Sequence, residues 1–294
     1  MKRIFLFIVT NLAVLALLTV VMFVLEQVLG VRLPRGGLGG LLVFAAVFGF
    51  GGALISLGLS KWTARQLMGV RVISSPQSEG EQWLIATVQR LAQHVGVAMP
   101  EVGIFDAGEM NAFATGARRN AALVAVSTGL LRNMTRSQIE AVLGHEISHV
   151  ANGDMVTLAL LQGVVNTFVI FLARIIGSLV DRALFRNDRE DSGIGYFLTT
   201  MVAQLVLGVI ASMIVSWYSR RREFRADRGG ADLAGTANMI SALQRLKSGE
   251  GEPMPPQMEA FGINRGSTAG WMRLLMSHPP LDERIAALET RVGQ

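Results

Sequence analysis

Four long runs of apolar residues constrain what this 294-residue chain can fold into more than any other feature. A helix rises about 1.5 Å per residue, so about 20 apolar residues cross a hydrocarbon core of about 30 Å. The chain is 51% hydrophobic and only 17% charged, which is more apolar than a soluble domain requires. We therefore predict a mainly α-helical membrane protein with four hydrophobic helices in two hairpins, at residues 4–25, 38–59, 155–180 and 196–217.

A secretory signal peptide is the alternative interpretation of the first run, which begins directly after Lys2 and Arg3. No Ala-x-Ala-like cleavage site follows this run, however, and the second run begins a short distance further on. We therefore predict a retained membrane anchor. Whether the third and fourth runs cross the membrane completely stays open, because Arg174 interrupts the third run.

Basic residues near the ends of the runs predict the orientation of the chain, because arginine and lysine are enriched in cytoplasmic loops. Their balance favours both termini and residues 60–154 on the cytoplasmic side, although the loop of the second hairpin also holds arginines. The same clusters suit anionic lipid head groups, and no basic strip interleaved with aromatic residues predicts nucleic-acid binding. The residues are Lys61, Arg65 and Arg71 after the second run, Arg220, Arg221, Arg222 and Arg225 after the fourth, and Arg182, Arg186 and Arg189 in the loop.

The polar segments predict one α+β domain that the second hairpin divides in sequence. Capping-box patterns at residues 78–81 and 135–138 predict helices to about residue 95 and to Asn152-Gly153. The tail predicts a helix that continues from the fourth run, followed by two more. Residues 103–105 and 121–127 predict short strands joined by a loop. The expected organisation is a hairpin at 1–59, the first segment of the α+β domain at 60–154, a second hairpin at 155–217 and the second segment of the α+β domain at 218–294.

Residues 144–149 read GHEISH and hold two of the four histidines in the chain. On a helix, His145 and His149 lie on one face and can bind one ion, and neutral imidazole is a good zinc ligand. Glu146, beside the first ligand, can accept a proton from the attacking water. The alternative is two histidines on an amphipathic helix, but the capping box places the motif within a real helix. The pattern predicts a zinc site.

A catalytic zinc site needs a third protein ligand. The chain has no cysteine, so the candidates are His94, His278 and the carboxylates. Glu223 can complete a site of two histidines and one glutamate, and Asp227, one turn further on, can accept the free ring N–H of a ligating histidine. The alternative is that both carboxylates pair with the surrounding arginines on a solvated face.

Four motifs follow one another along the chain: NAFATG at 111–116, HEISHVANGD at 145–154, REFRAD at 222–227 and SHPPLDERI at 277–285. Together with the N-terminal hairpin they resemble the HtpX family of bacterial membrane zinc metalloproteases, relatives of the Ste24 prenyl endoprotease. The resemblance covers the whole chain, and the four motifs in this order are far more specific than HExxH alone. It implies a zincin-like domain in which His145, His149 and Glu223 bind one Zn²⁺ and Glu146 is the base. Asp227 falls at the second acidic position of the family motif.

The resemblance also implies that an edge segment beside the zinc pairs with a substrate strand, through Asn111, Ala112, Phe113 and Ala114. The alternative is an exposed loop leading into a strand. In the family the turn at 277–280 lies close to the zinc. We predict that His278 donates to the developing oxyanion there, with Arg284 as a helper, whereas the alternative makes His278 a helix boundary only. Asp154 either supports the metal-binding helix or caps the next span.

These observations predict a zinc metalloendopeptidase of the bacterial inner membrane whose active site faces the cytoplasm. The resemblance adds a role in stress response and protein quality control, with misfolded or damaged membrane proteins as substrates. Two alternatives are an intramembrane protease, which the polar residues around HExxH disfavour, and a transporter or scaffold with a structural zinc. The sequence does not indicate an oligomeric state or a cleavage preference.

Overall fold

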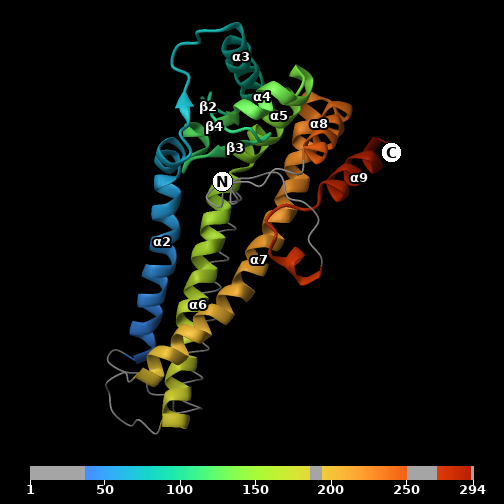
Figure 1. The fold of residues 1–294 in the computed structure, drawn as a ribbon. Coiled ribbons are helices and arrows are strands. Elements are labelled where there is room, and N and C mark those ends of the chain that lie inside the picture. The colour runs from blue at the N-terminus through green and yellow to red at the C-terminus, as the bar shows by residue number, and fades with distance from the viewer. Residues whose placement is uncertain (1–36, 186–193, 250–269, 293–294) are drawn as a thin grey trace. The chain divides into compact units, whose positions relative to one another are not determined.

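A computed structural model describes residues 37–185, 194–249 and 270–292 (Figure 1). The apolar run at 4–25 therefore lies outside the described residues, and so do Arg186 and Arg189 of the loop between the third and fourth runs. The described chain divides into two compact units. One contains residues 37–54, 160–185 and 194–212, and the other contains residues 55–159, 213–249 and 270–292.

Three helices are long and apolar enough to cross a membrane, judged by length and composition among the described residues. They are α2 (Gly37–Leu67), α6 (Asp154–Phe185) and α7 (Ile194–Ala234), and they contain the three apolar runs expected within the described ranges. At most 28% of the most apolar window of each helix is buried. Large side chains such as Val47, Phe48 and Leu205 are more than half exposed, which suits helices surrounded by lipid.

The first unit packs α2 against α6 at small residues. A Cβ atom at Gly49 would lie 2.6 Å from the backbone nitrogen of Thr167, and one at Gly163 would lie 2.7 Å from the ring of Phe50. Phe171 is fully buried in the same cluster as Leu38. Glycine at these positions lets the two helices approach closely, as is common for helices that pack within membranes.

The second unit contains a four-stranded sheet in the order β1-β2-β4-β3. Strand β2 (Glu101–Phe105) pairs in parallel with β4 (Leu123–Ser127), while β1 (Arg71–Val72) and β3 (Ala112–Thr115) pair antiparallel at the two edges. The expected strands at 103–105 and 121–127 are confirmed. The residue pattern alone predicts a loop at residues 106–120, but the structure places strand β3 there. The prediction was wrong because the pairing of β3 with β4 is a tertiary contact that the local pattern does not indicate.

Among its described residues, the second unit also contains several helices and two 3₁₀ turns, and its buried apolar residues form two clusters, one that includes Val124 and Val126 and one that includes Leu123 and Ala125 of β4. The helices and turns are α3 (Glu79–His94), the 3₁₀ turn η1 (Arg119–Ala121), α4 (Thr128–Asn133), α5 (Arg136–Asn152), α8 (Thr236–Ser248), the 3₁₀ turn η3 (Gly270–Leu275) and α9 (Leu281–Val292). The helices expected in the polar segments are confirmed, and α4 was not expected. Both bonds of the Thr135 and Gln138 capping box are present, and Gly153 ends α5 in the left-handed conformation at φ 66°.

Helix α5 belongs to the first of these clusters. Its residues from Ala141 to Val150 are all buried, and it packs against α3, α8 and β3. A helix that is buried on every side can hold polar groups in place without solvent competition. The HExxH motif lies within this buried stretch.

Candidate metal centre

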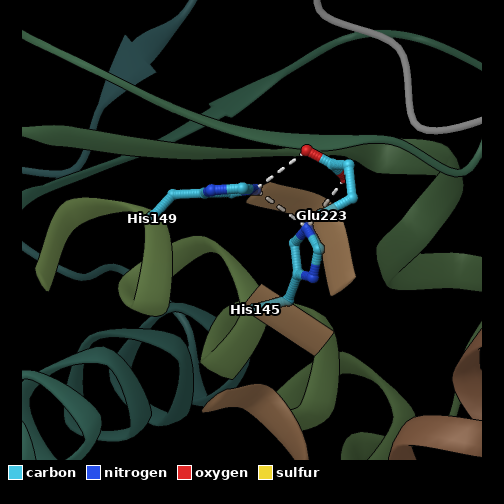
Figure 2. A group of neighbouring side chains, drawn as sticks. All are labelled: His145, His149 and Glu223. Carbon is cyan, nitrogen blue, oxygen red and sulfur yellow. Dashed lines mark hydrogen bonds and ion pairs between the residues drawn. The ribbon is translucent and has the colours of Figure 1, made fainter. Parts of the chain in front are cut away.

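Helix α5 directs His145 and His149 toward one point, as Figure 2 shows. Both side chains are buried, and their Nε2 atoms lie 3.1 Å apart. The two positions are four residues apart on one helix, so their side chains occupy the same face on successive turns. The residues predicted from the HExxH spacing therefore converge.

Helix α7 adds Glu223 to the pair. Its Oε2 lies 3.4 Å from His145 Nε2, and its Oε1 lies 3.3 Å from His149 Nε2. The helices α5 and α7 approach closely because glycine lies at their crossing: a Cβ at Gly230 would be 3.0 Å from the backbone nitrogen of His145. Residues 78 positions apart in sequence thus form one cluster, with His145, His149 and Glu223 offering ligand atoms within 4.8 Å of one another.

The spacing and the donor set of this cluster fit a tetrahedral metal ion. Ligand atoms about 2.05 Å from a tetrahedral ion lie about 3.3 Å apart, which is close to the separations observed here. Glu223 is fully buried, and neither of its carboxylate oxygens has a hydrogen-bond partner among the described residues. Because a buried carboxylate without hydrogen-bond partners is costly, a cation at this position explains the arrangement.

Carboxylates hold the outer nitrogens of both histidines. Nδ1 of His145 lies 2.9 Å from Asp227 Oδ1, and Nδ1 of His149 lies 2.7 Å from Asp154 Oδ2. A carboxylate can only accept, so each Nδ1 carries a proton and each Nε2 is the ring nitrogen that faces the cluster. Burial alone would lower the pKa of His145, but the neighbouring carboxylates of Asp227 and Glu223 outweigh it and raise this pKa to about 10, so a cation that binds at Nε2 would displace a proton from the ring.

Arg284 is a buried component of the site that sequence reasoning described only as a helper of His278. Its guanidinium binds both oxygens of Asp227, with Nε at 2.8 Å and Nη2 at 2.5 Å. Burial would lower the pKa of Arg284, but Asp227 outweighs this effect and raises it. A two-point contact of this kind fixes the orientation of the carboxylate. Arg284 therefore acts on the carboxylate that holds His145.

Glu146 is buried on α5 beside His145 and makes no ion pair with the described residues. Burial raises the pKa of its carboxyl group, and the nearby histidines oppose this rise. A carboxylate with a raised pKa is a better general base than a solvated one. The local environment is compatible with the role expected for Glu146.

His278 lies next to the cluster, at the start of the turn that precedes α9. Its Nδ1 is 2.8 Å from Glu223 Oε2, although neither atom has a partner with hydrogen-bond geometry among the described residues. We regard the two groups as neighbours that are not aligned for a hydrogen bond. Arg220 on α7 donates to the carbonyls of Arg273, Leu274 and Met276, which ties the segment before His278 to the helix that carries Glu223.

His94 and the segment from Asn111 to Ala114 are the remaining candidates, and they occupy different places in the fold. His94 is exposed at the end of α3 and is not a member of the metal-ligating cluster. The segment from Asn111 to Ala114 leads into and forms most of β3, which occupies one edge of the sheet and packs against α5. Asn111 and Ala112 are buried, so this segment is not an exposed loop.

Sequence reasoning left the place of Asp154 open and treated Arg225 only as a basic residue after a membrane span. In the structure Arg225 Nη2 donates to Asp154 Oδ1 at 2.5 Å, while the other oxygen of Asp154 accepts from His149. No local pattern in the sequence indicates that residues 71 positions apart meet. The only feature of the sequence that pointed to a role for Asp154 was its position directly after the helix-ending glycine.

A buried pair of histidines on an HExxH helix, joined by a glutamate from a second helix, defines a metallopeptidase centre. The chain belongs to peptidase family M48, whose family model matches residues 78–292. This range contains all the candidate site residues.

The chain is similar over nearly its whole length to proteins named Protease HtpX. It is 59% identical to that of Alkalilimnicola ehrlichii over 98% of both chains, and 58% identical to that of Pseudomonas entomophila over 99% of this chain and 100% of the relative. A Protease HtpX homolog of Thiobacillus denitrificans is also 59% identical, over 98% of this chain and 99% of the homolog. The resemblance inferred from the motifs is confirmed.

The fold is also similar to a solved structure, the crystal structure of S. mikatae Ste24p. The TM-score is 0.59 at 18% sequence identity, and the match covers 98% of this chain. The chain spans 65% of the length of that structure. This likeness shows a fold that the two proteins share.

Proposed function

We propose that this chain is a zinc-dependent endopeptidase anchored in the bacterial inner membrane, with its active site and both termini in the cytoplasm. His145, His149 and Glu223 would hold one Zn²⁺. The observation that carries the proposal is the buried carboxylate of Glu223, which has no hydrogen-bond donor among the described residues and lies within 3.4 Å of the Nε2 atoms of both histidines. Two histidines and a glutamate form a donor set typical of catalytic zinc in peptidases.

At the site formed by His145, His149 and Glu223, zinc would supply Lewis-acid chemistry: it would lower the pKa of water toward about 7 and polarise the scissile carbonyl. Glu146 then accepts the proton of the attacking water and passes it to the leaving amine nitrogen. Asp227 and Arg284 keep His145 in the tautomer whose Nε2 lone pair is available. The burial of Glu146 supports its assignment as the base, because it raises the pKa of the carboxyl group.

His278 is proposed to donate a hydrogen bond to the oxyanion that develops on the substrate. Its position beside Glu223 supports this role, and the contacts of Arg220 restrain the segment that precedes it. An aligned donor of this type contributes a few kcal/mol to the transition state.

The peptide substrate is proposed to add a strand beside β3, through the backbone of Asn111, Ala112, Phe113 and Ala114. The edge position of β3 next to the metal-binding helix supports this binding mode. Strand addition recognises an extended backbone of any sequence, which suits unfolded or misfolded membrane proteins as substrates. A role in quality control follows from this substrate class and stays a proposal.

We further propose that residues 60–154 and 218–294 form one protease domain, interrupted by the hairpin at 155–217 and preceded by the hairpin at 1–59. The compact unit that joins residues 55–159 to the end of α7 and the helices after it supports this organisation. The lipid bilayer is the expected partner of the exposed apolar helices.

The decisive experiment uses the purified full-length chain in detergent with an unfolded, casein-like substrate. Cleavage should require zinc, stop when a chelator is added and return when zinc is restored. A protein that binds zinc without hydrolysing any peptide would be a scaffold or transporter with a structural metal, and the proposal would then be wrong.

A further inference from the structure

Asp154 occupies a turn between the metal-binding helix and the first apolar helix that follows it. Gly153 ends α5 in the left-handed conformation, and Asp154 is the first residue of α6. This reversal directs the Asp154 side chain back toward His149, one turn before the end of α5. The residue is only 1% exposed.

Both oxygens of Asp154 are used within the site. Oδ2 accepts from His149 Nδ1 at 2.7 Å, and Oδ1 accepts from Arg225 Nη2 at 2.5 Å. A helix cap would instead accept from a backbone N–H in the first turn of α6, and no such bond of Asp154 occurs among the described residues. The contacts therefore favour support of the metal ligand over a capping role.

The two histidines are held in matching ways by different segments of the chain. His145 is held by Asp227, which is in turn held by Arg284 of α9. His149 is held by Asp154, which is in turn held by Arg225 of α7. The same chemistry, a histidine, a carboxylate and an arginine in series, thus occurs on both sides of the cluster.

We propose that Asp154 and Arg225 are positioning residues for metal binding, Asp154 by direct contact with His149 and Arg225 through Asp154. The inference rests on the proposed metal site. Asp154 fixes the tautomer and ring orientation of His149, and Arg225 binds the buried carboxylate and orients it. Arg225 lies two residues after Glu223, so α7 supplies one ligand directly and restrains a second.

This arrangement makes the metal site depend on both ends of the intervening hairpin. Asp154 stands at the beginning of α6, and Arg225 stands near the end of α7, with the apolar stretches of both helices between them in sequence. A change in how these two ends meet would alter the orientation of His149. The restraint on the ligand is therefore supplied by tertiary contact and not by α5 alone.

The test measures zinc affinity of the full-length protein in detergent by competition with a chromophoric chelator. Asp154→Asn should weaken zinc binding by about 10- to 100-fold, as expected when the partner of a ligating histidine is altered. Arg225→Gln, at a partly exposed side chain, should weaken it by about tenfold without preventing folding. The double variant should bind zinc about as well as Asp154→Asn, because residues that act in series are not additive.

Two matched controls lie on the same helix. Arg228→Gln removes an exposed arginine one turn after Arg225, and Asp232→Asn removes a carboxylate that pairs with the exposed Arg291. Both should bind zinc with the affinity of the parent protein. Cobalt substitution gives a second readout: the visible absorption of the Co²⁺ protein should change in Asp154→Asn, because the geometry at His149 changes. If the ion pair were purely structural, its loss in Asp154→Asn would lower the melting temperature of the metal-free protein and leave this spectrum unchanged.

Parental zinc affinity in Asp154→Asn would overturn the inference. Losses that add in the double variant would show that Arg225 does not act through Asp154, and would overturn its assigned role. A parent protein that binds no zinc at all would instead refute the metal site itself. The failure of the proposed function is therefore distinguishable from the failure of this inference.

Discussion

At the scale of single residues, Glu146 is the side chain whose loss should separate metal binding from hydrolysis. Glu146→Gln removes the proton acceptor and preserves the size of the side chain and all three ligands. We expect parental zinc content by elemental analysis and no detectable casein cleavage. His149→Ala is the companion variant, which should lose metal and activity together because two ligands hold zinc poorly. Cleavage near the parental rate by Glu146→Gln would remove this residue from the mechanism.

His278 provides a second test at this scale. His278→Ala should leave zinc bound and reduce kcat by about 10²- to 10³-fold with little change in KM, because a transition-state donor is lost. His94→Ala is the control, since His94 is exposed and lies outside the cluster, and its kinetics should match those of the parent. If His278→Ala cleaves as fast as the parent, His278 is a helix boundary only.

Glu223 and Asp227 lie one turn apart on α7, and their substitution should reduce zinc affinity to different extents. Glu223→Ala should abolish tight zinc binding, whereas Asp227→Asn should weaken it by about 10- to 100-fold through His145. Metal titration of both variants checks this order. Full zinc occupancy in Glu223→Ala would mean that the glutamate pairs with arginines, such as Arg222 at 3.8 Å, and does not bind metal.

At the scale of elements, the crossing of α5 and α7 determines whether the cluster forms. A Cβ at Gly230 would lie 3.0 Å from His145 N and 3.2 Å from Ala141 O, both of them backbone atoms that cannot rotate away. Gly230→Val should therefore force the helices apart, destabilise the fold by about 1–3 kcal/mol and weaken zinc binding. Thermal melting and metal titration measure both effects.

Gly208→Val serves as the control for this crossing. Gly208 lies on the same helix with no heavy atom within 4 Å of the Cβ position, so the variant should melt at or slightly above the parental temperature. Equal stability and equal zinc affinity of the Gly230 and Gly208 variants would show that the close approach of the helices is unimportant.

At the scale of the whole molecule, the exposed apolar helices predict the topology. Trp62 and Trp217 are both more than half exposed near the ends of apolar stretches, and Arg221 lies over the Trp217 ring at 4.9 Å. Tryptophan and arginine together are typical of the boundary between membrane and water. These residues suit the expectation that the segments after the second and fourth runs leave the membrane on one side.

Reporter fusions test this topology in cells. A fluorescent protein fused after residue 294 should fluoresce, because it folds in the cytoplasm, and alkaline phosphatase at the same place should be inactive. Alkaline phosphatase inserted between residues 186 and 193 should be active, because this loop is expected in the periplasm. The reverse pattern at either position would contradict the assigned orientation.

Local sequence determined much of this protein by itself. The apolar runs predict α2, α6 and most of α7, because length and composition suffice for a helix that crosses a membrane. The Thr135 and Gln138 capping box and Gly153 mark the two ends of α5, since caps are contacts between near neighbours in the chain. The spacing of His145 and His149 places them on one face because helical geometry is local.

Only the tertiary structure decided which distant residues meet. Strand β3 exists because it pairs with β4, and the place of Glu223 in the cluster depends on glycines at a helix crossing. Arg284 and Arg225 each reach a carboxylate that holds a histidine, and nothing in their neighbouring residues distinguishes them from solvated arginines. The physical reason is that a buried charge is stable only with a partner, and the partner is supplied by packing between elements far apart in the chain.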